Sequence, residues 1–269
     1  MAGLTVRRWL PFLAAGLVAG ALSGLFGIGG GLVLVPMMVF FFHFRQKVAQ
    51  ATSLGAIILT AIAAAIPYAL QTSVNWLAAG LIVVGGVGGS FAGAAIVKRV
   101  KDHWLQILFA VVAMVSAVKM LITTPPTAGH TGLSPTASVW AGLAYVGAGL
   151  AMGLLSALVG IGGGIILVPL LALLLGLPQT SAQGLSLIVM APISAVGAIR
   201  HAGSGYTNWR AALALGIGGA IMSPLSAQLA LHLPTTILPK LFAVLLIFTA
   251  GQLAYRAIKT MRSSRDKAA

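Results

Sequence analysis

The sequence is a succession of ten apolar segments joined by short polar connections, and few folds accommodate such a pattern. A hydrocarbon core about 30 Å thick is crossed by about 20 helical residues that each rise 1.5 Å. Eight segments come close to that length, whereas the second and the seventh have only about 13 residues. Because lipid offers no water to pair with an open backbone, the pattern predicts an all-α membrane protein. The segments are expected at 10–28, 31–44, 48–70, 76–97, 104–122, 139–160, 164–176, 181–199, 210–231 and 236–258.

The charge content is too low to cover a water-facing surface. Only 7% of the residues are charged and 59% are hydrophobic, whereas soluble domains carry roughly 25% charged residues. The net charge of +14 comes from 16 Lys and Arg residues that mostly stand between the apolar segments, without the clustered footprint of a nucleic-acid-binding module. The expected partner is therefore the lipid bilayer and not nucleic acid. The absence of cysteine excludes disulfides, thiolate metal ligands and cysteine nucleophiles.

The basic residues are confined largely to alternate connections. The connections near 71–75, 123–138, 177–180 and 232–235 contain no Lys or Arg. Because cationic loops are retained in the cytoplasm, both termini of this multi-pass chain are predicted to be cytoplasmic. The apolar run at 10–28 lacks a signal-peptide cleavage site and is expected to belong to the mature fold. The other connections and the two ends carry Arg7, Arg8, Arg45, Lys47, Lys98, Arg99, Lys101, Arg200, Arg210 and the basic residues beyond 258.

The chain contains two copies of one unit. Gly16–Trp76 aligns with Gly149–Trp209 without a gap, and more than a third of the aligned positions are identical. Each copy holds five segments, so the odd number predicts that the second copy is inverted in the membrane. Arg45 and Lys47 of copy one have uncharged counterparts in copy two, as an inverted-topology repeat of a secondary transporter requires. The predicted units are a first repeat at 1–122, an external linker at 123–138, a second repeat at 139–258 and a basic cytoplasmic tail at 259–269.

A Gly-Ile-Gly-Gly-Gly run interrupts each copy, at Gly27–Gly31 and at Gly160–Gly164. Each glycine costs about 1 kcal/mol of helix propensity relative to alanine, and each run precedes a segment too short to span. The runs therefore predict a broken or re-entrant hairpin in each repeat, with a helix N-terminus at membrane depth. Such an N-terminus presents unpaired N–H groups and about half a positive charge, to which glycine lets an anion come close. The expected anion-binding glycines are Gly27, Gly29, Gly30, Gly31, Gly160, Gly162, Gly163 and Gly164.

The alternative role for glycine is to let helices cross closely. That role is preferred for the glycines of the full-length segment at 76–97, which precede no short segment. They are Gly85, Gly86, Gly88, Gly89 and Gly93.

Polar side chains downstream of the runs are further candidates for contact with the substrate. Their hydroxyl and amide groups can donate hydrogen bonds to an oxyanion, although the same groups also tie helices together in membranes. Arg200 and His201 are candidates for guiding an anion, with an interfacial position as the alternative. The pairs Asn75-Trp76 and Asn208-Trp209 are interpreted as helix caps with interfacial anchors. The substrate-contact candidates are Gln50, Thr52, Ser53, Gln183 and Ser186.

The two acidic residues of the chain, Asp102 and Asp266, fall outside the predicted spans. No membrane carboxylate is therefore expected to relay protons or sodium. No histidine pair has metal-ligand spacing, and no Ser-His-Asp set can form within the spans. We therefore expect neither an enzyme, nor a cofactor, nor a metal site.

The doubled Gly-Ile-Gly-Gly-Gly-x-x-Leu-Val-Pro motif, with Ala51-Thr52-Ser53 downstream and Asn-Trp closing each unit, resembles the TauE/SafE family of sulfite exporters. The resemblance covers roughly residues 10–258. It implies a bacterial inner-membrane carrier of sulfite or small organosulfonates. Copy two departs from the pattern, because it reads Gly184-Leu185-Ser186.

The expected function is alternating-access transport of a small sulfur-containing oxyanion. A passive anion channel is the main alternative, followed by an intramembrane enzyme or assembly factor. The sequence leaves open the coupling ion, the direction of flux and whether the chain forms a homo-oligomer.

Overall fold

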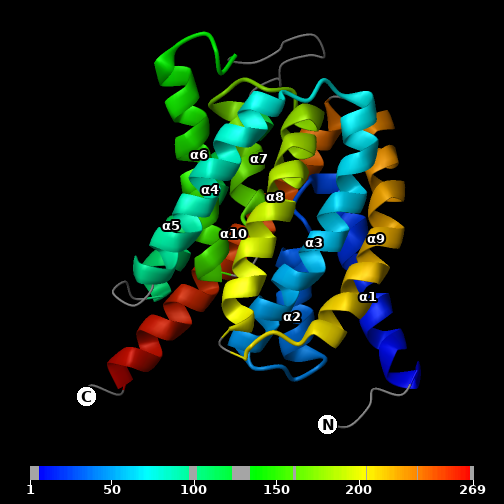
Figure 1. The fold of residues 1–269 in the computed structure, drawn as a ribbon. Helices are drawn as coiled ribbons and strands as arrows, with labels where there is room; N and C mark the ends of the chain where they lie inside the picture. The colour runs from blue at the N-terminus through cyan, green and yellow to red at the C-terminus, as the bar shows by residue number, and fades with distance from the viewer. Residues whose placement is uncertain are drawn as a thin grey trace.

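The computed structural model describes residues 6–96, 102–122, 134–159, 162–203, 205–234 and 236–266, and within them the fold is entirely helical (Figure 1). Ten helices lie where the apolar segments predict them, so the all-α architecture is confirmed. They are α1 (Val6–Phe26), α2 (Gly31–Phe40), α3 (Gln46–Gln71), α4 (Trp76–Ile96), α5 (Asp102–Ile122), α6 (Val139–Val159), α7 (Gly164–Leu173), α8 (Gln179–Ala202), α9 (Trp209–His232) and α10 (Ile237–Asp266).

The helix bounds refine the expected segments at three places. The two short helices α2 and α7 have 10 residues each. The chain leaves each of them early and turns before it enters α3 or α8. Helix α10 runs on to Asp266, so residues 259–266 of the expected tail continue the last helix. Of the expected linker at 123–138, residues 123–133 lie outside the described residues.

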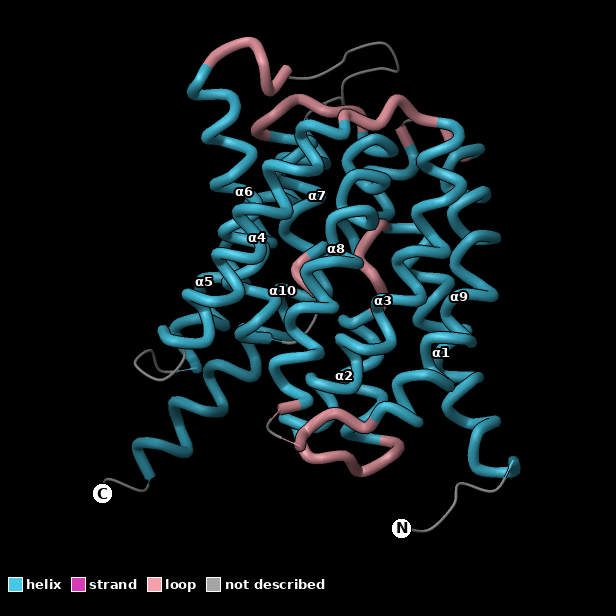
Figure 2. Tube along the Cα trace, in the orientation of Figure 1, coloured by secondary structure: helices cyan, strands magenta, loops and turns pink. Residues whose placement is uncertain are grey.

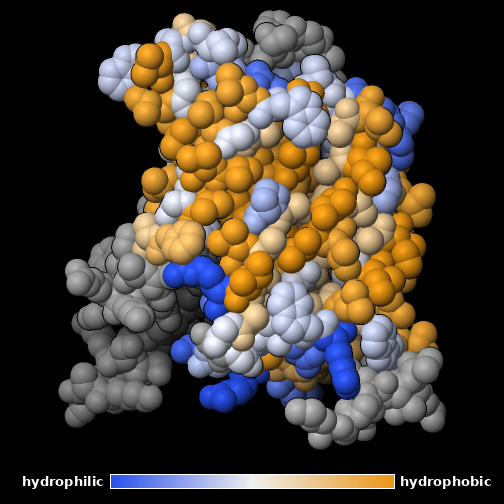
Figure 3. Space-filling model, viewed as in Figure 1, coloured by the Kyte–Doolittle hydropathy of each residue, from blue (hydrophilic) through white to orange (hydrophobic). Residues whose placement is uncertain are grey.

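Four helices of the described chain are long and apolar enough to cross a membrane, namely Trp9–Phe26 of α1 and the whole of α3, α8 and α9. On the face shown in Figure 3, hydrophobic side chains cover the broad middle and hydrophilic residues gather toward the two ends. Large apolar side chains such as Leu70, Val139 and Trp140 point outward. An outer surface of this kind is suited to lipid rather than to water.

The two halves do not form separate domains, because helices of one half pack against helices of the other (Figure 2). The most extensive contacts join α1 to α9, α4 to α6, α5 to α10, and α3 to both α8 and α9. In the alignment of the two repeats, α1 corresponds to α6 and α9 corresponds to α4. The α1–α9 contact of the structure is therefore equivalent to the α6–α4 contact. Helices α2, α3 and α4 begin at positions equivalent to the starts of α7, α8 and α9, and the alignment continued without a gap also pairs the starts of α1 and α6.

The two termini lie at one end of the molecule, where α1 begins and α10 ends (Figure 1). The α2–α3 and α8–α9 connections lie at this same end, which is called the termini end below. Arg45, Lys47 and Arg210 are exposed there. Helix α6 begins at the opposite end, so α1 and α6 run in opposite directions through the molecule.

Glycines of α4 allow close packing against α6 and α8, and a packing role was predicted for them because they lie in a full-length segment. A β-carbon on Gly85 or Gly89 would meet the backbone of α6, and one on Gly86 would meet Ile193. Gly88 faces open space, so close packing does not explain it. The packing role is therefore confirmed for three of the glycines.

Candidate functional site

The two glycine runs break the chain because their backbone is left-handed. Gly30 and Gly163 precede α2 and α7 with φ of 78° and 76°, and neither helix has a side-chain cap. A β-carbon on Gly30 would lie 2.9 Å from the Ala19 carbonyl oxygen, and one on Gly163 would lie 2.7 Å from the Met152 carbonyl oxygen. Both the backbone conformation and the space therefore require glycine.

The breaks of the two halves meet inside the bundle, away from both ends (Figure 2). A β-carbon on Gly164 would lie 3.0 Å from the carbonyl oxygen of Gly27 and from Cα of Ile28. The structure thus places the described glycines of the first run next to those of the second, Gly162–Gly164. Gly160, the remaining glycine of the predicted site, lies outside the described residues.

Some backbone donors at the first break have no acceptor within the described part of the chain. The N–H of Gly27 donates to the Ser23 carbonyl at 2.8 Å, and the N–H of Leu34 donates to the Gly30 carbonyl at 3.0 Å. Between them, the N–H groups of residues 28–30 find no acceptor among the described residues. The buried hydroxyl of Ser23 likewise has no partner in the described part of the chain. The N–H groups of residues 28–30 could donate hydrogen bonds to an oxyanion at the break.

Two apolar side chains, Ile57 and Met190, fill the space in front of the breaks. They occupy equivalent positions of the two halves and are fully buried. The methyl end of Met190 contacts Gly29 and would lie 2.5 Å from a β-carbon on Gly162. Ile57 would lie 3.1 Å from a β-carbon on either glycine. This pair was not predicted from the sequence, where its only signal is its position one helical turn beyond Ser53 and Ser186.

Gln183 braces the first break. Its Oε1 lies 3.0 Å from the Tyr68 hydroxyl, and its Nε2 donates to the Leu25 carbonyl at 3.3 Å. The Tyr68 hydroxyl also lies 2.7 Å from the Gly24 carbonyl oxygen. The side chain of Gln183 therefore packs at Gly27 while its amide holds the last turn of α1. The role of Tyr68 was likewise not predicted from the sequence.

The other polar candidates divide between the break and the helix backbone. The hydroxyl of Ser186 lies 3.8 Å from the Met190 sulfur, beside the break. Ser53 donates to the carbonyl of Gln50 at 2.8 Å, within its own helix, and the Gln50 side chain is half-buried. Thr52 is fully buried and accepts from the backbone N–H of Asn208 at 3.1 Å.

Arg200 and His201 stand apart from the glycine breaks, in the last turn of α8. Arg200 is exposed, donates to the Ser90 carbonyl at 3.4 Å and lies 4.2 Å from the centre of the Phe91 ring. These contacts attach the end of α8 to α4. The geometry therefore does not bring the two predicted guidance residues to the glycines.

Asn75 and Asn208 cap α4 and α9, as predicted. Asn75 Oδ1 accepts from the Ala78 N–H at 3.0 Å, and Asn208 Oδ1 accepts from the Ala211 N–H at 3.1 Å. The following residues, Trp76 and Trp209, are exposed. The cap interpretation is confirmed at both positions.

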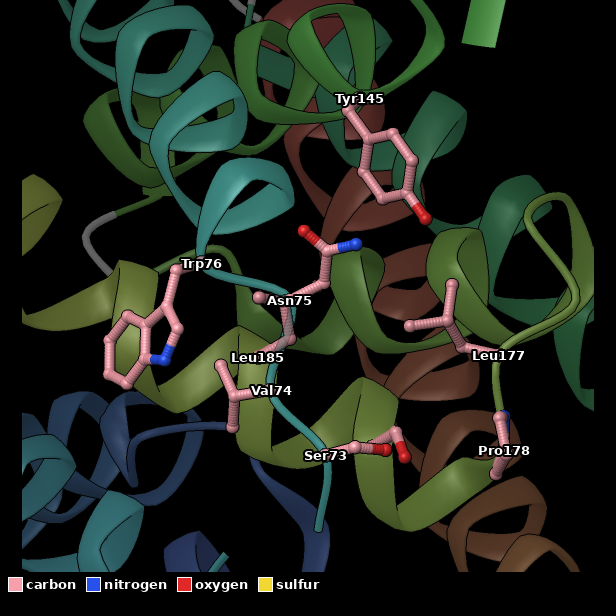
Figure 4. A pocket seen from close by; sticks show the side chains of 9 residues that line it. Ser73, Val74, Asn75, Trp76, Tyr145, Leu177, Pro178 and Leu185 are labelled. Carbon is pink, nitrogen blue, oxygen red and sulfur yellow. The ribbon is translucent and has the colours of Figure 1, made fainter. Parts of the chain in front are cut away.

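A pocket of about 420 Å³ opens between the halves (Figure 4). The connections that line it lie at the end of the molecule opposite the termini (Figure 1). The α3–α4 connection, the α7–α8 turn, α8 and α6 form its walls. Amide and hydroxyl groups share its lining with apolar side chains, and none of the lining residues is charged. They are Ser73, Val74, Asn75, Trp76, Tyr145, Leu177, Pro178, Ser181 and Leu185.

An all-helical membrane protein with two helix breaks meeting inside the bundle has the architecture of a membrane transporter. The chain belongs to the sulfite exporter TauE/SafE family, whose sequence pattern it matches over residues 12–253. It is 29% identical over 262 residues to the probable membrane transporter protein YunE of Bacillus subtilis (strain 168), covering 90% of this chain and 96% of the relative. It is 25% identical over 260 residues to a probable membrane transporter protein of Xylella fastidiosa (strain Temecula1), covering 94% and 98%. No solved structure matches the chain.

Proposed function

We propose that the protein is a secondary transporter of a small sulfur-containing oxyanion, sulfite or an organosulfonate, that works by alternating access. The observation that carries this proposal is the meeting of the two glycine breaks. Helices α2 and α7 start there without side-chain caps, and donors of the first break lack partners among the described residues. An oxyanion between two helix N-termini would accept these hydrogen bonds and interact favourably with both helix dipoles.

In this proposal, Met190 moves aside when the anion binds. Methionine has a flexible, unbranched side chain, so its methyl end can leave the glycines without a shift of the backbone. The Ser186 hydroxyl then loses the sulfur as its neighbour and faces the anion. Gln183 keeps the end of α1 in place while the site is occupied.

The proposed membrane arrangement is an inverted repeat with both termini in the cytoplasm of a bacterial inner membrane. Three features support it: the matching starts of the helices, the exchange of helix partners between halves, and the opposite directions of α1 and α6. The exposed Arg45, Lys47 and Arg210 at the termini end agree with cytoplasmic retention of cationic loops.

Thiol labelling tests this arrangement, and the chain has no native cysteine to interfere. Ser73 and Tyr206 occupy equivalent connections of the two halves. In intact cells, a membrane-impermeant thiol reagent is expected to label the Ser73→Cys variant and to leave the Tyr206→Cys variant unlabelled until the cells are opened. Labelling of both variants from the same side would contradict the inverted repeat.

Counterflow separates the transporter from a passive anion channel. We expect sulfite or a sulfonate trapped inside proteoliposomes to accelerate uptake of the labelled anion severalfold, because a carrier returns faster when loaded. A channel would show no such trans-stimulation. A parallel screen with sulfite, sulfoacetate, taurine and sulfate identifies the anion, and liposomes without protein serve as the control. Absence of uptake for all four anions would refute the proposed substrate class.

A further inference from the structure

The two ends of the molecule differ at equivalent positions. The pocket lies at the end opposite the termini, and the alignment of the two repeats assigns each pocket residue a counterpart at the termini end. Leu177 and Leu185 of the pocket correspond to Phe44 and Thr52. Continued without a gap toward the starts of α1 and α6, the same alignment pairs Tyr145 of the pocket with Phe12. These differences in sequence coincide with differences in packing.

Aromatic rings fill the termini end. Phe12 stacks on Phe42 with ring centres 4.2 Å apart and planes 15° apart, and the centre of Phe44 lies 6.1 Å from that of Phe12. At the pocket end, the counterparts of Phe42 and Phe44 are Leu175 and Leu177. Stacked rings bury more surface than leucines do, and offset stacking adds about 0.5–1.5 kcal/mol per pair.

Thr52 joins the two halves to each other at the termini end. Its buried Oγ1 accepts from the backbone N–H of Asn208 at 3.1 Å, which holds the α8–α9 connection on α3. The equivalent pair at the pocket end is Leu185 and Asn75. The leucine side chain has no hydrogen-bond acceptor, so the link that Thr52 makes cannot form at the pocket end. Leu185 and Asn75 instead line the pocket. The departure of the second repeat from the Ala-Thr-Ser pattern thus falls on this link.

We infer that Thr52 is a positioning residue that holds the gate at the termini end closed, together with the ring cluster of Phe12, Phe42 and Phe44. The pocket is the open entrance of the same conformation. To open toward the termini, the protein must release the Asn208 N–H from Thr52 and separate the rings. This inference rests on the alternating access of the proposed function.

A labelling experiment tests the gate without any substrate. Val48 is the counterpart of the pocket residue Ser181, so Val48→Cys reports on access from the termini end. In this background, Thr52→Val removes the acceptor at nearly constant volume, and Thr52→Ser retains it. We expect Thr52→Val to raise the rate of thiol labelling from the termini side about fivefold, as the loss of one hydrogen bond predicts. Thr52→Ser should leave the rate unchanged.

Phe44→Leu provides a second variant, since it installs the residue that the pocket end carries. Phe44→Leu should also raise the rate at which Val48→Cys is labelled from the termini side. In both Thr52→Val and Phe44→Leu, labelling of Ser181→Cys from the pocket side should become slower. Unchanged rates in Thr52→Val and Phe44→Leu would overturn the gate. If the labelling rates are unchanged but the wild-type protein shows counterflow, the gate is wrong and the proposed function is still supported. If labelling becomes faster but no anion is taken up, the substrate class is wrong and the gate inference stands.

Discussion

Replacing Gly163 by alanine is expected to reduce anion uptake by about tenfold or more, whereas the same replacement at Gly205 should have little effect. Both glycines have positive φ, of 76° and 71°, so both variants carry a similar backbone strain of roughly 1–2 kcal/mol. Only Gly163 has a backbone neighbour in the way, the Met152 carbonyl oxygen, 2.7 Å from the added carbon. The start of α7 must therefore shift, and loss of one hydrogen bond to an anion costs about 1.5–3 kcal/mol.

Uptake into proteoliposomes, together with thermal unfolding of the purified variants, measures this effect. Gly205 is exposed and nothing lies within 4 Å of its added carbon, so it controls for backbone strain alone. Gly30→Ala probes the first break in the same way. Wild-type uptake by folded Gly30→Ala and Gly163→Ala would show that the breaks do not bind the anion.

Replacing Gly89 by leucine is expected to disrupt the fold itself. Its β-carbon would meet the Leu150 carbonyl, with the carbonyl carbon and the Leu154 nitrogen each 2.9 Å away. Because these are backbone atoms, α4 must move away from α6, and overpacking of this kind costs about 1–3 kcal/mol or more. We expect the unfolding temperature to fall by on the order of 5–10 °C, with a lower yield of monodisperse protein.

Gly88→Leu is the matched control for this variant. Gly88 is the preceding residue of the same helix, and nothing lies within 4 Å of its added carbon. Leucine there improves helix propensity by up to about 1 kcal/mol, so stability should be unchanged or slightly higher. Equal unfolding temperatures for Gly88→Leu and Gly89→Leu would mean that α4 and α6 do not cross as closely as described.

Local patterns predicted much of the architecture. The apolar runs predicted ten helices, and the glycine runs predicted where α2 and α7 begin, because hydropathy and left-handed backbone are properties of short stretches. The caps at Asn75 and Asn208 were predicted for the same reason, since each acts within three residues. The ends of the short helices were less accurate, because apolar residues continue into the turns that follow them.

The roles of side chains around the breaks were harder to predict. Gln183 was expected to face the substrate, and its amide is used to hold Tyr68 and the end of α1. Arg200 was a candidate for guiding the anion, and its guanidinium lies on Phe91 of α4. Each side chain is polar in the sequence, but only its neighbours in space determine whether its hydrogen bonds are already used.

The sequence alone establishes that the chain is helical, that its second half repeats the first and that each repeat must break at a glycine run. These follow from the solvation of the backbone in lipid and from the φ angles that only glycine adopts readily. The tertiary structure decides that α1 packs on α9, that Met190 covers both breaks and that Thr52 binds Asn208. Thr52 and Asn208 are separated by 156 residues along the chain, and no local pattern specifies contacts between segments so far apart.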